Sequence, residues 1–251
     1  MAKRVPVIAG NWKMNTDMES GLKLVKEILD FSENFSGVDK IVCPPFVSIT
    51  SVAQELSGSS IHVGAQNVSA SSDGAFTGEV STSMLRRFVS HVIVGHSERR
   101  ALNGETSESV AEKAVAAAGA GIKPIVCVGE DLEVRKAGNA ETYVATQLEE
   151  SLIGYTDWGS LIVAYEPVWA IGTGEAATSE QAQEMTRVCR DVIRKLAPEA
   201  PDSVRVLYGG SVNSGNVVEL LAQPDIDGAL VGAASLKADE FSKLIAAASA
   251  S

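Results

Sequence analysis

Short runs of apolar, mostly β-branched residues recur along the 251-residue chain, and stretches with helical periodicity separate them. The runs are Val5–Ala9, Lys40–Cys43, Ile61–Ala65, His91–Gly95, Lys123–Val128, Leu161–Tyr165, Val204–Tyr208 and Gly228–Val231. Such near-continuous apolar strands are typical of a parallel sheet that helices cover on both faces. Eight strand–helix units in a chain of 251 residues fit a (β/α)8 barrel, which we predict as a single domain over residues 1–251. A doubly wound open sheet is the alternative, but no linker divides the chain.

The stretches between the strands predict the helices. Thr16–Glu19 and Thr178–Gln181 have the spacing of a capping box, in which two side chains close the first turn of a helix. We expect helices from Thr16 to about Asp30, after Thr178, and over Thr106–Ala120, Glu133–Ile153, Asn216–Leu221 and Ala238–Ala248. Only the segment Ser81–Phe88 has a weak pattern.

Composition restricts the partners of this chain. The net charge is −11 and there is no run of Lys or Arg, so we expect no nucleic-acid partner. An anionic substrate must therefore be attracted by a few local cations and backbone N–H groups. The three cysteines are odd in number and lack Cys-x-x-Cys spacing, which indicates a reducing compartment and no zinc site. No segment resembles a signal peptide or a membrane span, so we expect a cytoplasmic protein without membrane contact.

In a (β/α)8 barrel the chemistry lies at the carboxyl ends of the strands. The polar or small residues that follow the predicted strands are therefore the candidates, and they should converge on one face of the barrel. They are Asn11, Lys13, His96, Glu166, Gly209, Gly210, Ser211, Gly232 and Ala233.

The stretch Ala164–Gly174 predicts a base that can be covered. An apolar strand ends in Glu166, and Pro167 holds that residue in extended geometry. The apolar segment Val168–Ile171 then precedes two glycines, Gly172 and Gly174, which leave the backbone unhindered. An apolar flap that excludes water would raise the basicity of the carboxylate. The alternative is a loop whose Trp169 fills a groove and whose Glu166 is solvated.

His96 precedes what looks like the first turn of a helix. Backbone N–H groups there would point at the ring and disfavour the imidazolium, so a neutral imidazole could donate to a substrate carbonyl. The alternative is a histidine that merely caps or packs. His91 lies five residues earlier along a strand, about 16 Å away, so the two cannot share a metal. We therefore expect no metal.

Lys13 and Asn11 could stabilise an oxyanion. A Schiff-base lysine, as in class I aldolases, is the competing interpretation of Lys13. Gly209–Ser211 and Gly232–Ser235 could cradle a phosphate with backbone N–H groups, although turn glycines have the same pattern. Gly172–Ala177 matches the dinucleotide fingerprint, but it lies several residues beyond its strand, so we expect no cofactor.

Taken together, these motifs resemble the triosephosphate isomerase family. The matching segments follow the order of that family from the first strand to the last. They are Asn11–Asn15, Gly64–Asn67, Gly74–Glu79, Gly95–Arg100, Cys127–Glu130, Ala164–Gly174 and Tyr208–Val212.

The resemblance implies cofactor-free interconversion of dihydroxyacetone phosphate and D-glyceraldehyde 3-phosphate, two phosphorylated trioses. Glu166 would move the carbon-bound proton, and His96 would move protons on the oxygens of an enediolate. The remaining roles are implied in the same way: Lys13 and Asn11 bind substrate, Glu98 supports Lys13, Gly172, Ser211, Gly232 and Ala233 hold the phosphate, and Ile171 and Leu230 press on Glu166. The family also implies a homodimer in which the loop Gly74–Glu79 enters the partner.

Two positions depart from the family pattern. Ala233 stands where the family usually has glycine, and alanine would be strained if the site needs a positive φ. We expect weaker phosphate binding with the mechanism intact. Ala101–Glu105 replaces a segment that commonly holds aromatic residues, and there we expect only local repacking. A non-catalytic phosphate-binding barrel and an aldolase are the alternative functions.

Overall fold

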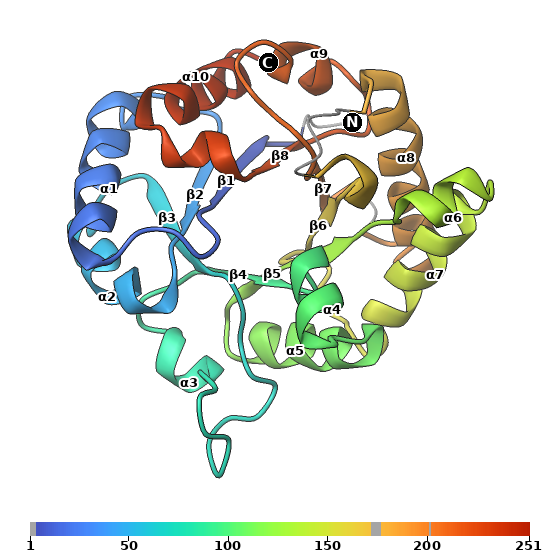
Figure 1. Cartoon of the computed structure of the whole chain (residues 1–251), viewed down its shortest axis with the longest axis horizontal. Helices are drawn as coiled ribbons and strands as arrows, with labels where there is room; N and C mark the ends of the chain where they lie inside the picture. Colours follow the sequence, from blue (N-terminus) through green and yellow to red (C-terminus); the bar gives the residue numbers. More distant parts are fainter. Residues whose placement is uncertain (1–3, 172–176, 201) are drawn as a thin grey trace.

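A computed structural model describes residues 4–171, 177–200 and 202–251 of the chain. Eight parallel strands pair in chain order and close into a barrel, which confirms the predicted (β/α)8 fold (Figure 1). The strands are β1 (Val7–Asn11), β2 (Asp39–Cys43), β3 (Ile61–Ala65), β4 (His91–Val94), β5 (Lys123–Val128), β6 (Ile162–Tyr165), β7 (Arg205–Tyr208) and β8 (Gly228–Val231). β1 closes the barrel because it pairs with both β2 and β8.

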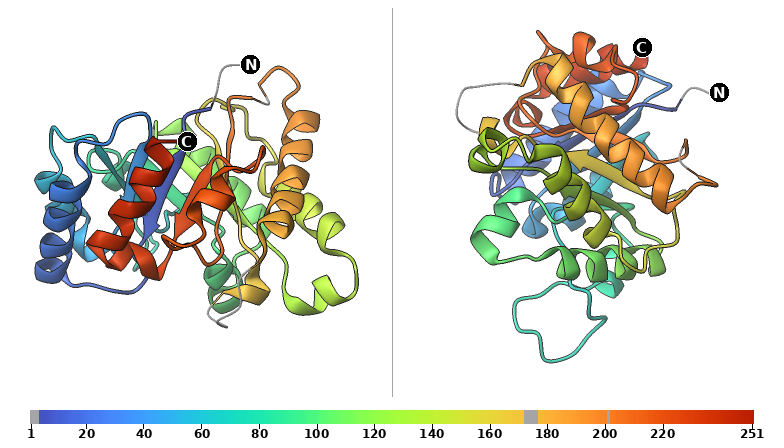
Figure 2. Two further views of the ribbon diagram at one scale, coloured as in Figure 1. Left: turned by 90° about the horizontal axis from the view of Figure 1, so that it is seen from above. Right: turned by 90° about the vertical axis from the view of Figure 1, so that its right-hand side faces the viewer.

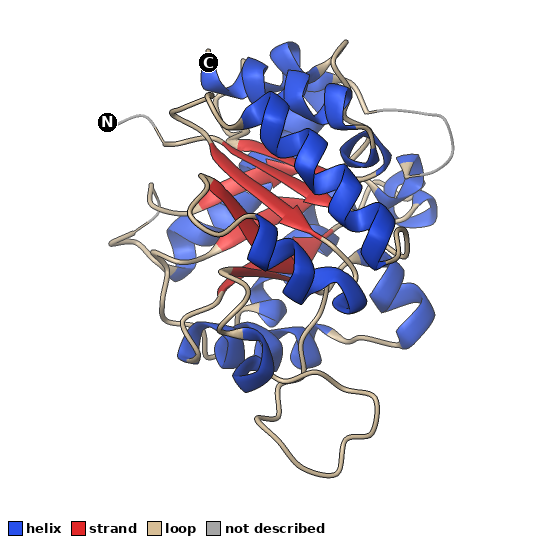
Figure 3. Cartoon of the chain, turned by 90° about the vertical axis from the view of Figure 1, so that its left-hand side faces the viewer, coloured by secondary structure: helices blue, strands red, loops and turns tan. Residues whose placement is uncertain are grey.

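Helices surround the barrel on its outside, as the side views show (Figures 2 and 3). They are α1 (Met18–Ser32), α2 (Phe46–Glu55), α3 (Thr82–Leu85), α4 (Ser97–Asn103), α5 (Ser107–Gly119), α6 (Leu132–Lys136), α7 (Ala140–Ser151), α8 (Ser179–Leu196), α9 (Val217–Leu221) and α10 (Ala238–Ser249). Two short 3₁₀ turns, η1 (Val168–Ala170) and η2 (Ala233–Leu236), follow β6 and β8. The described residues include no helix long and apolar enough to cross a bilayer.

Alternate residues of each strand point to opposite faces, so the barrel has two hydrophobic cores. The inner core consists of small and branched side chains, among them Val7, Ile41, Ile93, Ile125 and Leu207. The outer core fills the layer between strands and helices. All three cysteines are free and buried, and burial raises the pKa of the Cys43 and Cys189 thiols to about 12. This agrees with the interpretation of these cysteines as small buried hydrophobes rather than nucleophiles.

The predicted capping box at Thr16–Glu19 is wrong by one residue. α1 is capped by Asp17, whose carboxylate accepts the Ser20 N–H at 2.8 Å while the Ser20 hydroxyl accepts the Asp17 N–H. Thr16 instead lies in the preceding loop with a φ of 72°, outside helical geometry. The capping boxes at Thr106 and Thr178 are present, and the second of these was predicted.

The predicted continuous helix Glu133–Ile153 is also wrong. α6 ends at Lys136 and α7 begins at Ala140. Between them Gly138 adopts a φ of 73°, a left-handed conformation that ends helices and that glycine adopts without strain. α2 was not among the predicted helices; Pro44 and Pro45 precede it, and Pro45 takes its N-cap position.

His91 gives the fold a dependence on acid. It lies at the start of β4 with 3% of its surface exposed, and its pKa is lowered from 6.5 to about 3, first by burial and then by the charges of His62, Lys123 and Arg205. Between these pH values only the unfolded chain protonates this ring. The free energy of unfolding should therefore fall as the pH falls from 6.5, by up to about 1.4 kcal/mol per pH unit.

Urea titrations between pH 6.5 and 5 measure this slope. In His91→Gln the slope should become shallower than in the wild type, because the variant has no ring to protonate. Lys23→Gln is the control: this exposed residue is not among the charges that act on His91, so the variant should keep the wild-type slope. Equal slopes in the wild type and His91→Gln would show that His91 is not the responsible group.

Candidate active site

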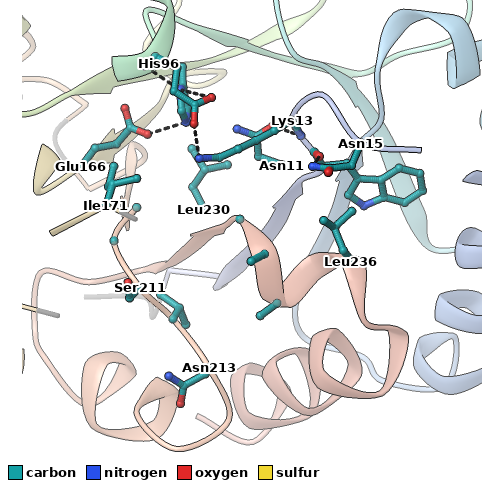
Figure 4. A pocket seen from close by; sticks show the side chains of 18 of the residues that line it. Asn11, Lys13, Asn15, His96, Glu166, Ile171, Ser211, Asn213, Leu230 and Leu236 are labelled. Carbon is teal, nitrogen blue, oxygen red and sulfur yellow. Dashed lines mark hydrogen bonds and ion pairs between the residues drawn. The ribbon is translucent and has the colours of Figure 1, made fainter. Parts of the chain in front are cut away.

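A cavity of about 840 Å³ lies at the carboxyl ends of the strands (Figure 4). It brings together the predicted site residues from five separate strand–helix loops. Those lining it are Asn11, Lys13, His96, Glu98, Glu166, Ile171, Ser211, Leu230, Gly232 and Ala233. Gly172, the remaining predicted residue, lies outside the described residues. All of these residues therefore come from the carboxyl ends of β1, β4, β6, β7 and β8, or from the loops that follow them. This is where the chemistry of a (β/α)8 barrel is expected.

Glu166 and His96 face each other inside this cavity (Figure 4). Glu166 Oε1 is 2.9 Å from His96 Nε2, and Glu166 Oε2 accepts the Ser97 backbone N–H at 2.9 Å. The two residues are 1% and 5% exposed, so water hardly competes for these bonds. The alternative of a solvated Glu166 is therefore wrong for this structure. His96 comes from the end of β4 and Glu166 from the end of β6.

In this pair, burial and the charged partner shift the pKa of each group in opposite directions. Burial alone would raise the pKa of the Glu166 carboxyl, but His96 and the Ser97 N–H together hold that pKa below its ordinary value. For His96, burial favours the neutral ring, and the neighbouring Glu166 carboxylate nevertheless raises its pKa. Both shifts thus depend on contact between the two groups, which stabilise each other's charged forms.

The N-terminus of α4 fixes the orientation of the His96 ring. His96 occupies the N-cap position, and its Nδ1 accepts the Glu98 backbone N–H at 3.2 Å. A nitrogen that accepts a hydrogen bond carries no proton, so the ring proton lies on Nε2, the atom that faces Glu166. This is the arrangement expected of a histidine that donates from Nε2 while neutral.

Lys13 reaches across the cavity from the loop after β1. Its backbone has a φ of 54°, and its N–H donates to the side-chain oxygen of Asn11 at 3.0 Å. The Gln66 amide donates to the Lys13 carbonyl at 2.8 Å, which helps to hold this unusual conformation. Lys13 Nζ lies 2.5 Å from Glu98 Oε1, so its charge is held at the mouth of the cavity. Asn11 is 5% exposed and acts here as an acceptor for the Lys13 backbone.

The flap that follows Glu166 is anchored by a residue that the prediction did not include. The buried Glu130 accepts hydrogen bonds from the Trp169 indole at 2.9 Å, from the Tyr165 hydroxyl at 3.0 Å and from Arg135 at 2.9 Å. Arg135 also lies 4.9 Å from the centre of the Trp169 ring. Glu130 lies two residues beyond the end of β5, in the segment Cys127–Glu130. A polar residue so close to the end of a strand was the sequence signal that could have identified it.

Backbone N–H groups line the opposite side of the cavity. In the described part of the chain, those of Ser211, Gly232 and Ala233 donate to no protein acceptor. Gly209 differs, because its N–H bonds the Tyr165 carbonyl at 2.7 Å and is not free for a ligand. Position 209 instead requires glycine for a steric reason, because a Cβ there would lie 2.9 Å from Glu166 Cγ. The predicted cradle is thus wrong at Gly209, and phosphate binding by the N–H groups of Ser211, Gly232 and Ala233 stays a prediction.

Ala233 is not strained. It begins η2, and among the described non-glycine residues only Lys13 and Thr16 have a positive φ. The condition for backbone strain at Ala233, a positive φ, is therefore not met. This exposed residue lines the cavity, and a steric effect of its methyl group on a bound phosphate stays a prediction. Asn213, Lys237 and Glu240 line the outer part of the same cavity and were not predicted. They lie several residues beyond the ends of β7 and β8, whereas the prediction considered only the residues that closely follow each strand.

The described residues contain no group of three or more His, Cys, Asp or Glu side chains that could hold a metal ion. The polar groups that converge on the cavity include the Glu166 carboxylate, the His96 imidazole, the Lys13 ammonium and backbone N–H groups. Such a set can move protons and stabilise an oxyanion.

Comparisons with known proteins give one family. The family model described as triosephosphate isomerase matches residues 6–248. The chain is 48% identical to a triosephosphate isomerase of Rhodopirellula baltica, over 99% of each chain. It is 49% identical to one of Carboxydothermus hydrogenoformans, over 96% of this chain and 98% of the relative, and 50% identical to one of Dehalococcoides mccartyi, over 94% of each. By this match and by its barrel, the chain belongs to the triosephosphate isomerase family.

Proposed function

We propose that this protein interconverts dihydroxyacetone phosphate and D-glyceraldehyde 3-phosphate through an enediolate, without a cofactor. The observation that carries the proposal is the contact of Glu166 with His96 at 2.9 Å inside one cavity that Lys13 also lines. A base, a hydrogen-bond donor and a cation at one barrel mouth suit proton abstraction from a carbon next to a carbonyl. Family membership supports the same reaction.

Glu166 begins the reaction by leaving its contacts with Ser97 and His96 and turning toward the substrate carbon. The substrate carbonyl then receives the hydrogen bond that His96 Nε2 gives to Glu166 in this structure. As the carboxylate leaves, the main cause that raises the pKa of His96 weakens. Burial and the Glu98 N–H on Nδ1 remain, and both favour the neutral ring. A neutral imidazole can donate to one oxygen and afterwards pass protons between the two oxygens.

Lys13 and Asn11 bind the substrate oxygens, and the Lys13 ammonium stabilises the negative charge of the enediolate. Glu98 keeps the ammonium at the cavity when no substrate is bound. Ile171 and Leu230 lie on the apolar side of the cavity, where they exclude water from the Glu166 carboxylate.

The N–H groups of Ser211, Gly232 and Ala233 bind the phosphate, and Gly172 contributes a further N–H from the flap. For the first three residues this role is supported by N–H groups that have no protein acceptor among the described residues. Local donors are needed because the chain as a whole carries a net charge of −11, which repels an anionic substrate.

We also propose that the protein is a cytoplasmic homodimer that assembles through the loop Gly74–Glu79. The segment between β3 and α3 projects from the barrel (Figures 1 and 3), and Ser69 N–H bonds the Val80 carbonyl at 2.8 Å to close its base. Phe76 in this loop is 51% exposed and Met14, next to Lys13, is 97% exposed. A second copy would cover both apolar side chains. The three free thiols fit a reducing compartment.

A coupled assay of the purified protein in both directions tests the proposed reaction. Turnover should be accompanied by exchange of the carbon-bound proton with deuterated solvent, because a base removes that proton and returns one. A phosphate-binding protein would bind both trioses without turnover in the wild type and in Glu166→Asp. An aldolase would form a lysine adduct that borohydride traps, whereas none is expected here.

Replacing Ala233 with glycine should lower KM a few-fold and leave kcat unchanged, because removal of the methyl group lets the phosphate approach the backbone more closely. Steady-state kinetics with both trioses measure this effect. Ala234→Gly is the matched control, since it makes the same change one residue further along η2 in the same cavity. An unchanged KM and kcat in Ala233→Gly would reject the steric effect.

A further inference from the structure

A second, smaller cavity lies at the other end of the barrel. It has a volume of about 280 Å³ and forms where the turn between α2 and β3 meets the turn between α3 and β4. Both turns lead into the amino ends of their strands, whereas the active site lies beyond the carboxyl ends. The two cavities share no lining residue.

The charged and titratable side chains that line this second cavity are all basic. They are His62, Arg86 and Arg87, and no Asp or Glu contributes to the lining. All three are exposed, and neither arginine forms an ion pair with any residue that the structure describes. The hydroxyl groups of Ser59 and Ser90 and the aromatic ring of Phe88 complete the wall.

The neighbouring barrel residues strengthen the positive potential at this point. The ring of His62 lies 5.6 Å from that of the buried His91, centre to centre. Lys123 and Arg205 at the starts of β5 and β7 act on the same buried ring, and with His62 they disfavour its protonation. Arg205 does have a carboxylate near it, Asp39, but that contact is 3.8 Å long. Carboxylates also lie near this end of the barrel, among them Glu33, which accepts the Ser60 N–H at 3.2 Å, but neither Glu33 nor Asp39 lines the cavity.

We propose that this cavity is a binding site for a small phosphorylated solute, which it holds by its phosphate. Two guanidinium groups can donate paired hydrogen bonds to phosphate oxygens, a geometry that a lysine cannot reproduce. The imidazole of His62 and the hydroxyl of Ser59 add further donors at the wall, whereas the Ser90 hydroxyl is engaged with His91 Nδ1 at 2.8 Å. The volume accommodates one or two phosphate groups rather than a large ligand, so inorganic pyrophosphate is a suitable probe.

Binding at this cavity can be distinguished from binding at the active site, because the NMR signal of each of the three histidines of the chain reports on a different part of the structure. His62 lines the second cavity, His96 lines the active site, and His91 is buried beside His62. Inorganic pyrophosphate is titrated into the full-length protein at low ionic strength, where screening is weak, and the imidazole NMR signals are followed. The His62 signals should shift saturably, since a bound anion changes the surroundings of this ring.

In Arg86→Gln/Arg87→Gln the pyrophosphate affinity reported by His62 should fall roughly tenfold or more, because charge-assisted hydrogen bonds are lost. The response of His96 and the isomerase kinetics should stay at wild-type values. Lys23→Gln/Lys136→Gln removes the same charge from two exposed positions and should leave the His62 response intact. Two results would overturn the proposal: a His62 signal that does not saturate, or equal His62 affinities in the wild type and the arginine variant. Neither result would affect the proposed isomerase reaction, which His96 and turnover report separately.

Discussion

Glu166→Gln is expected to lower kcat by roughly 100- to 10,000-fold, the range that a positioned general base contributes. Glutamine has nearly the same shape, and its amide oxygen can still accept the Ser97 N–H that Glu166 binds at 2.9 Å. An amide cannot accept the substrate proton, so the chemical step slows while the phosphate contacts remain. The loss should therefore appear in kcat with little change in KM.

The matched control is Glu240→Gln, which makes the same change in a carboxylate that lines the same cavity. Glu240 is engaged with Lys243 and Ser214 on the outer side and has no place in the proposed chemistry. Its kcat should stay within a factor of about two of the wild type, since surface changes of this kind have small effects. If Glu166→Gln retained more than about a tenth of the wild-type kcat, the general base would have to be another group.

The sequence predicted the barrel because its strands are apolar on both faces and short enough to be recognised one by one. β3, β5 and β8 begin and end at the predicted residues. The site followed from the topology, since parallel strands in a barrel bring their carboxyl ends together whatever their distance in sequence. Glu166 and His96 are 70 residues apart (166 minus 96), yet each was identified from its own strand end.

What the sequence did not predict depends on contacts between distant segments or on single backbone conformations. Glu130 becomes an anchor only because Trp169 and Tyr165 fold back onto it. Lys40 lies in β2, as predicted, but its strand position did not indicate that its buried ammonium donates to the Ser32 and Phe35 carbonyls. No local pattern encodes such partners. The break of the predicted long helix at Gly138 shows the second limit, because the helical periodicity on both sides continues across it.

The electrostatics of the resting site also differ from the prediction. A flap that excludes water was expected to make Glu166 more basic, whereas contact with His96 holds its pKa below the ordinary value. The two statements concern different states of the site. Contact with His96 lowers the basicity of the resting carboxylate, and the proposed movement of Glu166 away from His96 removes that influence while its burial persists.

Lys13→Met is expected to lower kcat roughly 100- to 1,000-fold and to raise KM, because one fixed donor to a developing oxyanion has an effect of that size. The stem of Lys13 runs beside the phosphate end of the cavity: a Cβ on Gly232 would lie 3.6 Å from Lys13 Cε. Its ammonium lies at Glu98, close to His96. One side chain therefore extends between the two ends of the proposed substrate, and both binding and chemistry should suffer.

The fold should survive this change, so the loss can be assigned to function. Glu98 is 45% exposed, and an exposed ion pair contributes at most about 1 kcal/mol to stability. Methionine is unbranched like lysine and tolerates the φ of 54° equally well. Steady-state kinetics should therefore show the loss while Tm stays within about 4 °C of the wild type. Lys23→Met, at an exposed helical position, is the matched control and should change neither quantity. A Lys13→Met enzyme with wild-type kcat and KM would exclude the ammonium from the reaction.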